Sequence, residues 1–287
     1  MSTLRSLEIR DCNDISDCIV LGAMLLTFAF KLRPRDAFPI AQRTLSLVKP
    51  RYDSLPQDDP ERQVFLSCLV TAELFDCIIQ CQVPTLRFKP ISLPGHVDRF
   101  VGLCTHLLPL LYDLCELNHA FSRADQNNVD GLHAALDRLE QSIIGWQPRM
   151  EPGFMTSFTG SEMAHMLCQV QVFRHMAFLI IHRLRYPFND NDEPAQVMSR
   201  TILDSLQLTR VVTQKAVRCV SLAFVFACFE LQDQAAREYW LSKCNVLVGY
   251  SVDHRDRLDN IIKSLWAARD SGKRLYSFNL NQAVPSI

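Results

Sequence analysis

Apolar residues recur along this chain at intervals of three and four, and almost nowhere at intervals of two. After Asp59-Pro60-Glu61, apolar side chains follow at Phe65, Leu66, Leu69, Val70, Leu74 and Ile78. That spacing places them on one face of a helix, and an aspartate followed by a proline and an acid is a typical helix start. No stretch alternates cleanly between polar and apolar residues, as a half-buried strand would. The sequence therefore predicts an all-α fold.

The same start and stop signals predict about ten helices packed in a single large domain. They are expected near residues 14–31, 36–49, 60–82, 96–122, 130–145, 161–185, 194–213, 217–231, 235–248 and 254–270. Two loops rich in proline and glycine, 84–95 and 146–160, are flanked by apolar helices, which favours connectors within one domain over linkers between two. We expect an N-terminal tail over 1–13, the helical domain over 14–270 and a C-terminal tail over 271–287.

Two local features need separate interpretation, a proline inside an expected helix and an acidic tract just before another. Pro109 lies within the helix expected over 96–122 and should kink or divide it, because proline removes a backbone donor and crowds the preceding turn. The tract Asp190-Asn-Asp-Glu193 looks like a carboxylate metal motif on paper. Its position just before Pro194 favours an N-capping loop instead.

Charge and cysteine content limit the classes of function. Thirty basic residues against 31 acidic ones give a net charge of −1, without the positive field that a domain needs to hold duplex phosphates by itself. We therefore expect no direct DNA binding by this chain alone. Most of the 11 cysteines sit inside apolar helical patterns, which is typical of reduced core residues in a reducing compartment.

Targeting and membrane signals are weak. The N-terminal residues show no apolar run with a small-residue cleavage site, as a secretory signal would. The longest apolar run, 19–30, is shorter than the roughly 20 residues needed to cross a bilayer. A buried helix is the favoured interpretation, and no membrane partner is expected.

Common catalytic and cofactor motifs are absent from the sequence. It contains no Gly-x-Gly-x-x-Gly, Walker, His-Glu-x-x-His or Cys-x-x-Cys pattern. Cys77 and Cys81 are four apart, and Cys12 and Cys18 six apart, but neither pair has a second Cys/His pair at zinc-ligand spacing. A zinc site is not predicted.

Two polar clusters are open to a functional and to a structural interpretation. Asp113 and Glu116 lie three apart on one side of an expected helix and could hold magnesium, or form a solvated edge beside a leucine stripe. Arg174, His175, His182 and Arg185 fall at helical spacings and could bind an anion, or make buried hydrogen bonds and contacts at a helix C-terminus. The structural interpretation is favoured for both clusters.

Several segments resemble the regulatory, or middle homology, domain of fungus-specific zinc-cluster transcription factors. The resemblance covers roughly residues 15 to 270 and is carried by segments 21–28, 35–37, 65–70, 84–88, 97–104, 107–113 and 181–188. It implies an all-helical domain that serves in regulation, dimer contacts or effector sensing. The sequence departs from the family pattern because no six-cysteine zinc cluster, basic linker or coiled coil precedes the domain, so no DNA contacts can be transferred.

That resemblance implies a transcription-regulatory or effector-sensing domain of a fungal (secondary-)metabolism regulator. Such a domain would act in the nucleus through a protein partner or as a homodimer. It would need no cofactor, and its ligand would be a small apolar molecule.

A weaker similarity to atypical fungal humulene synthases implies an alternative, a cytoplasmic, Mg²⁺-dependent sesquiterpene cyclase acting on farnesyl diphosphate. Under that alternative, Asp113 and Glu116 would bind the metal, and Arg174 and Lys215 would bind the prenyl diphosphate. Aromatic walls would stabilise carbocations; the candidates are Phe173, Phe178, Phe224, Phe226 and Phe229.

Overall fold

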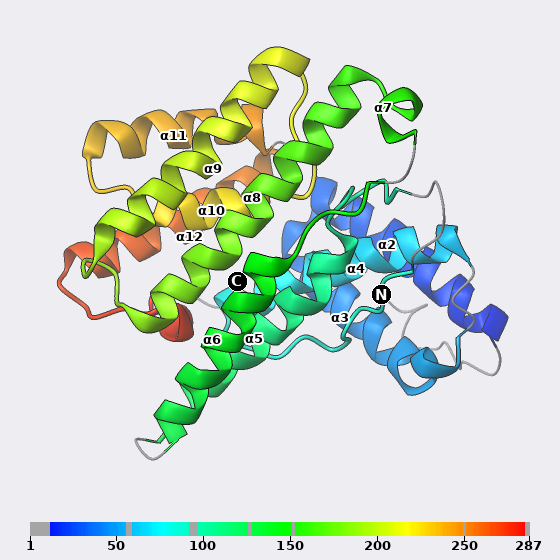
Figure 1. Cartoon of the computed structure of the whole chain (residues 1–287), viewed down its shortest axis with the longest axis horizontal. Coiled ribbons are helices and arrows are strands. Elements are labelled where there is room, and N and C mark those ends of the chain that lie inside the picture. The colour runs from blue at the N-terminus through cyan, green and yellow to red at the C-terminus, as the bar shows by residue number, and fades with distance from the viewer. Residues whose placement is uncertain are drawn as a thin grey trace.

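The chain folds into α-helices joined by loops and short 3-10 turns (Figure 1). The computed structural model describes residues 12–55, 59–91, 97–125, 128–150, 153–248 and 251–284. Within those ranges no strand forms, and the nearest approach to one is the bridge between Asp98 and Gly102. The predicted all-α class and single domain are confirmed.

The bounds of the longer helices agree with the expected ranges to within a few residues, with one exception, and the short helix α7 lies in the expected loop over 146–160. The helices are α2 (Cys12–Leu32), α3 (Ala37–Val48), α4 (Pro60–Ile79), α5 (Leu108–Ser122), α6 (Val129–Gly145), α7 (Phe154–Ser157), α8 (Gly160–Arg185), α9 (Asp192–Thr213), α10 (Ser221–Phe229), α11 (Gln234–Leu247) and α12 (Val252–Asp270).

The exception is α5, which begins at Leu108 rather than near residue 96. Residues 97–107 form a loop and a short 3-10 turn, Thr105–Leu107. Pro109 lies in the first turn of α5, where its missing N–H would have no helical partner, so proline opens this helix instead of kinking it. The prediction of a kinked or divided helix was wrong for that reason.

Helix caps follow the sequence in part. The Asp59 side chain caps α4 by accepting a hydrogen bond from Arg62 N at 3.1 Å, as predicted. The acidic tract before Pro194 supplies the N-cap residue of α9, Asn191, as expected, but Asn191 makes no side-chain cap hydrogen bond. The carboxylate of Asp192 accepts from Arg183 Nη2 at 2.6 Å, so it forms an ion pair with the end of α8.

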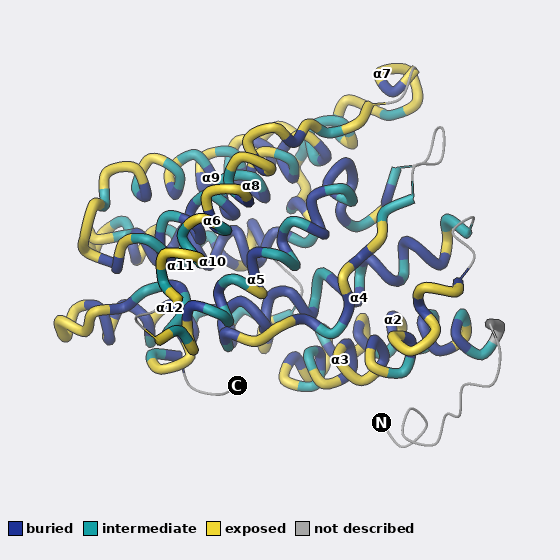
Figure 2. Tube along the Cα trace, turned by 60° about the horizontal axis from the view of Figure 1, so that its bottom comes forward, coloured by how far each residue is buried: buried dark blue, intermediate teal, exposed yellow. Residues whose placement is uncertain are grey.

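The helices form two groups that meet at the centre of the molecule. Helices α2, α3 and α4 pack against one another, and α8, α9 and α10 do the same, with α12 against α10 and α11 alongside. Every residue of α10 is buried, and Figure 2 shows it surrounded by the neighbouring helices. Helix α5 contacts α4, α6 and α8, and so connects the two groups.

Close packing of α2 on α3 depends on Gly22. A Cβ at this position would lie 2.4 Å from Thr44 Cγ2 and Oγ1, closer than real side chains approach. Helices α2 and α8 are long and apolar enough to span a membrane by length and composition alone. Both bury a face in the core, through Ile15, Ile19 and Leu26 on α2 and Val172, Met176 and Ile180 on α8.

The region beyond α12 packs onto the domain. Leu275 and Leu280 are buried, and Phe188 N donates to Leu275 O at 2.8 Å. The boundaries proposed at residues 13 and 270 stay predictions. Ten of the 11 cysteines are free thiols. All of these ten except Cys68 and Cys219 are buried, as the sequence indicated.

Candidate functional site

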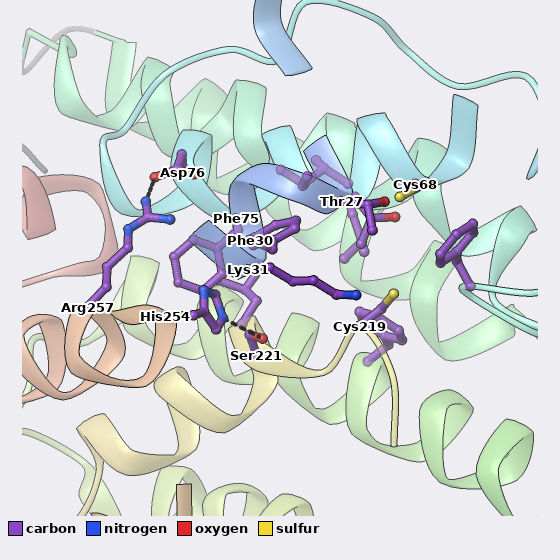
Figure 3. A pocket seen from close by; sticks show the side chains of 17 residues that line it. Thr27, Phe30, Lys31, Cys68, Phe75, Asp76, Cys219, Ser221, His254 and Arg257 are labelled. Carbon is purple, nitrogen blue, oxygen red and sulfur yellow. Dashed lines mark hydrogen bonds and ion pairs between the residues drawn. The ribbon is translucent and has the colours of Figure 1, made fainter. Parts of the chain in front are cut away.

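An apolar cavity of about 220 Å³ lies where the two helix groups meet (Figure 3). Its lining comes from α2, α4, α5, α8, α10 and α12, together with Phe100 and Cys219 from two connecting segments. Segments from both ends of the chain therefore build one site. We call it the interhelical cavity.

Aromatic and aliphatic side chains form most of its wall. They are Phe30, Leu74, Phe75, Phe100, Leu111, Phe173 and Leu222. An apolar cavity of ~150 Å³ in a protein core can take up benzene. The interhelical cavity is therefore large enough for a small organic ligand, and its wall favours an apolar one.

A histidine and a serine supply hydrogen-bonding groups to the cavity. His254 Nε2 lies 3.4 Å from Ser221 Oγ, and the imidazole packs edge-on against the Phe30 ring with centroids 5.3 Å apart. Burial, and then the charge of Arg257, lower the pKa of His254 to about 4. This histidine is therefore neutral at neutral pH.

An ion pair between α4 and α12 lies next to His254, on the left of the cavity in Figure 3. Arg257 Nη2 donates to Asp76 Oδ1, and its guanidinium lies 5.5 Å from the centre of the Phe75 ring. Burial raises the pKa of Asp76 despite the opposing effect of Arg257. The pair thus joins the two helix groups beside the cavity.

Helix α2 forms the outer side of the cavity. Thr27 and Lys31 are exposed and also line it, with the Lys31 side chain pointing toward Cys219 in Figure 3. On the inner side, burial raises the pKa of the Cys68 thiol well above its usual range. Cys68 is thus held as a neutral thiol and is a poor nucleophile.

The lining suits binding better than catalysis. His254 is kept neutral, Asp76 is paired and Cys68 is protonated. Among the residues that the structure describes, no group of three or more His, Cys, Asp and Glu side chains is placed to hold a metal ion. A site of this kind encloses an apolar molecule and offers it few polar contacts.

The predicted metal ligands lie outside the cavity. Asp113 on α5 accepts from Arg87 Nε and Nη2 at 2.8 and 2.9 Å, so the guanidinium occupies both carboxylate oxygens. Glu116 is exposed. Burial of Tyr112, and next the negative charge of Glu116, raise the pKa of Tyr112 to about 12. This arrangement does not favour a metal cation at Asp113 and Glu116, because the Arg87 guanidinium already neutralises the Asp113 carboxylate.

The predicted diphosphate ligands are not brought together in one pocket. Arg174 Nη2 donates to Ile144 O at 2.6 Å, at the end of α6, and its guanidinium lies 5.7 Å from the Phe178 ring centre. Lys215 instead lines a separate polar cleft beside the start of α8. Arg174 thus has a structural role in this arrangement, whereas Lys215 lies in a cleft.

The remaining members of the basic cluster have partners within the fold. His175 Nδ1 lies 2.8 Å from Gln171 O, and His182 Nε2 lies 2.9 Å from Asn191 O. Arg185 Nη2 donates to Asp137 and Glu140, each at 2.7 Å. These contacts agree with the structural interpretation of the cluster.

Of the five candidate aromatic residues, Phe173 lines the interhelical cavity. Phe224, Phe226 and Phe229 are fully buried core. Sequence reasoning missed Phe30, Phe75, Phe100, His254 and Arg257, because they lie on separate segments and share no motif.

A family model described as a fungal specific transcription factor domain matches residues 20–279. This range includes all the residues that line the interhelical cavity. Neither a curated protein nor a solved structure matches the chain.

Proposed function

The chain belongs to the family of fungal specific transcription factor domains, which gives it a transcription-regulatory role, and we propose that it performs this role by sensing a small apolar effector. The observation that carries the proposal is the interhelical cavity, with its aromatic wall and few polar groups. Ser221 and His254 provide a place for one hydrogen-bonding group on an otherwise apolar ligand.

The position of the cavity supports a sensing role. Its walls belong to α2 and α4 on one side and to α10 and α12 on the other. A ligand there contacts both helix groups, so its binding energy favours whichever arrangement of the groups fits it best. The Asp76–Arg257 ion pair, which links α4 to α12, is one contact that such a shift would alter.

The output of this domain is proposed to pass through protein contacts. The family match is to a fungal specific transcription factor domain, and we infer that this domain affects transcription through a protein partner or a homodimer. The proposed location is the nucleus. An apolar effector fits a regulator of fungal (secondary) metabolism, whose pathway products include apolar molecules.

Binding of a neutral, environment-sensitive dye such as N-phenylnaphthylamine tests the cavity directly. Ala72→Phe on α4 places a ring in the cavity, because Ala72 is one of its lining residues. Ala134→Phe on α6 makes the same change at an exposed position and is the matched control. We expect the wild type and Ala134→Phe to enhance dye fluorescence, and Ala72→Phe to lose the enhancement while keeping its helical circular dichroism.

A reporter assay then connects the cavity to transcription. The full chain is fused to a heterologous DNA-binding domain, and reporter output is compared for the wild type and both variants across a panel of apolar metabolites. Metabolite-dependent output that Ala72→Phe abolishes supports the proposal. Output that is the same in all three proteins and independent of metabolites contradicts it.

The sesquiterpene cyclase is the second candidate, favoured by the four phenylalanine rings of the cavity wall. The proposed metal ligands argue against it, since Arg87 occupies the Asp113 carboxylate. Incubation with farnesyl diphosphate, with and without Mg²⁺, followed by gas chromatography and mass spectrometry, distinguishes the two functions. We expect no Mg²⁺-dependent hydrocarbon, and its appearance would replace the regulatory proposal with an enzymatic one.

A further inference from the structure

A second, polar cleft of about 620 Å³ lies beside the start of α8. It is formed by residues 97–102, the first turns of α8 and the segment 215–218 between α9 and α10. Three exposed cations, Arg99, Lys215 and Arg218, lie along it. We call it the basic cleft.

None of these three cations forms an ion pair within the described part of the chain, although, beside the hydrogen bonds from Thr159, the charge of Lys215 helps to lower the pKa of Glu162. The side chains of Arg99, Lys215 and Arg218 make no ion pair or hydrogen bond there, whereas Arg87, Arg183, Arg185 and Arg237 are all paired with carboxylates. Cations gathered in one concave place without a partner produce a local positive potential, even though the net charge is only −1.

The two described carboxylates of the cleft are already engaged. Asp98 is buried, and its oxygens accept from Ser67 Oγ at 2.6 Å and from Phe100 N at 2.7 Å. Glu162 completes the capping box of α8 by accepting from Thr159 N at 2.8 Å. Neither carboxylate is paired with the three cations.

The positive field reaches the histidine on the cleft wall. Burial lowers the pKa of His165, and the charges of Lys215 and Arg218 lower it further. His165 Nε2 lies 2.8 Å from Thr213 Oγ1, which itself donates to Thr209 O at 2.7 Å. The threonine therefore accepts from Nε2–H, which leaves Nδ1 as the position that can take up a proton.

A buried glutamine holds the backbone that carries the two arginines. Gln169 Nε2 donates to Phe100 O at 2.7 Å and to Arg218 O at 3.0 Å, which ties the two cleft segments together. Gly102 has φ +55, and a Cβ there would lie 2.7 Å from Gln169 Oε1. The loop can close around the glutamine only because this residue is glycine.

We propose that the basic cleft binds a small anion that carries a phosphate or diphosphate group. Arg99, Lys215 and Arg218 come from two separate segments and can approach several oxygens of one anion, which suits a multivalent tetrahedral group better than a single carboxylate. The cleft is concave and limited to these cations, which favours a small phosphorylated molecule over a nucleic acid.

The basic cleft also shares a wall with the interhelical cavity. Arg99 and Arg218 line the cleft, while their neighbours Phe100 and Cys219 line the cavity. The proposed anion site does not depend on the effector proposal, because its cations and its glutamine anchor lie on the cleft side. The two proposals can therefore fail separately.

Calorimetric titration of the full chain with inorganic pyrophosphate tests the anion site. Lys215→Ala and Arg218→Ala are the test variants, and both residues are exposed, so the fold is expected to survive. Lys263→Ala on α12 and Arg138→Ala on α6 remove the same charges at exposed positions outside the cleft. Thermal unfolding by circular dichroism verifies that all four variants are folded.

We expect pyrophosphate to bind, more weakly as salt rises, and each cleft variant to weaken binding by about tenfold, the scale of one lost charge-assisted contact. The control variants should keep wild-type affinity. Absence of binding, or equal affinity in cleft and control variants, overturns the proposal. If citrate binds as tightly as pyrophosphate, the assignment to a phosphate group is overturned. If a short DNA duplex binds through Lys215 and Arg218 and pyrophosphate does not displace it, the assignment to a small anion is overturned.

Discussion

Arg183 and Glu230 form a two-point ion pair inside the core, although one lies on α8 and the other follows α10. Arg183 Nε donates to Oε1 at 2.9 Å, and Nη2 donates to Oε2 at 2.5 Å. The same guanidinium donates to Asp192 Oδ1 and to the carbonyl oxygens of Pro187 and Asp190. All the donors of this buried arginine therefore have acceptors, and three segments are joined at one point.

Loss of the Glu230 charge should destabilise the domain strongly. Glu230→Gln keeps the size of the side chain but leaves Arg183, whose side chain is fully buried, with only Asp192 to neutralise it. Breaking a buried pair from one side typically costs about 3–5 kcal/mol in the free energy of unfolding. Asp137→Asn, which removes an exposed partner of Arg185, should cost no more than about 1 kcal/mol. Urea denaturation measures both, and equal effects would contradict this role of Glu230.

Gly22→Ala should separate α2 from α3. The added methyl would overlap Thr44, and overpacking of this kind costs roughly 1–3 kcal/mol. Gly131→Ala is the matched control, because a Cβ on this α6 glycine meets nothing within 4 Å. It should stabilise the domain by up to about 1 kcal/mol, since alanine is the better helix former. Thermal unfolding should therefore move in opposite directions for the two variants.

His254 should make stability depend on pH. Its pKa is lowered from 6.5 to about 4 in the folded domain, so the unfolded chain binds the proton more readily. The contribution of neutral His254 to the free energy of unfolding is present above pH 6.5 and is lost as the pH falls from there toward 4. The loss is on the order of 3 kcal/mol.

The comparison that isolates this effect is with His254→Gln, measured by urea denaturation at several pH values. The pKa values of Asp76 and Glu230 are raised by burial and act in the opposite direction, but they are present in both proteins. The difference in stability between wild type and variant should shrink as the pH falls. A difference that is constant with pH would mean that His254 does not titrate as described.

Anion binding in the basic cleft should strengthen as His165 takes up a proton. The groups around this imidazole are Lys215 and Arg218, which oppose protonation, with Arg99, Glu162 and Asp98 elsewhere in the cleft. A bound anion offsets the two cations and favours the charged histidine. Sulfate is a suitable probe, because its charge stays constant from about pH 8 to about pH 5, the range in which histidine titrates.

We expect sulfate affinity to rise by about threefold or more over that fall in pH, and His165→Gln to remove most of the rise. Calorimetric titration at each pH gives the affinity. If both proteins show the same pH profile, His165 does not contribute to the site.

Much of the fold could be predicted because its signals are local. Asp59 caps α4 through a residue three positions away, and the apolar spacing that follows it identifies the buried face. The prediction of a helix over 96–122 was wrong at its start, where two local signals conflicted. Residues 97–107 carry helix-like apolar spacing, but Pro109 favours a helix start, and the proline prevailed.

The candidate sites were predicted far less well. Asp113 and Glu116 share a helix face, as the spacing indicated, but the sequence did not show that Arg87 would occupy the Asp113 carboxylate. Lys215 was selected as an anion ligand and does lie in a basic cleft. Arg174, selected with it, bonds to the end of α6 instead.

The sequence by itself determined most of the helices, the Asp59 cap of α4 and the all-α class, because helical spacing and capping act over three or four residues. Only the tertiary structure decided which polar groups became partners and where cavities remained. Arg183 bonds to Glu230, and the Phe30 ring packs against His254, although the members of each pair lie far apart in the chain. Such contacts depend on how whole helices pack, and no local sequence pattern encodes this packing.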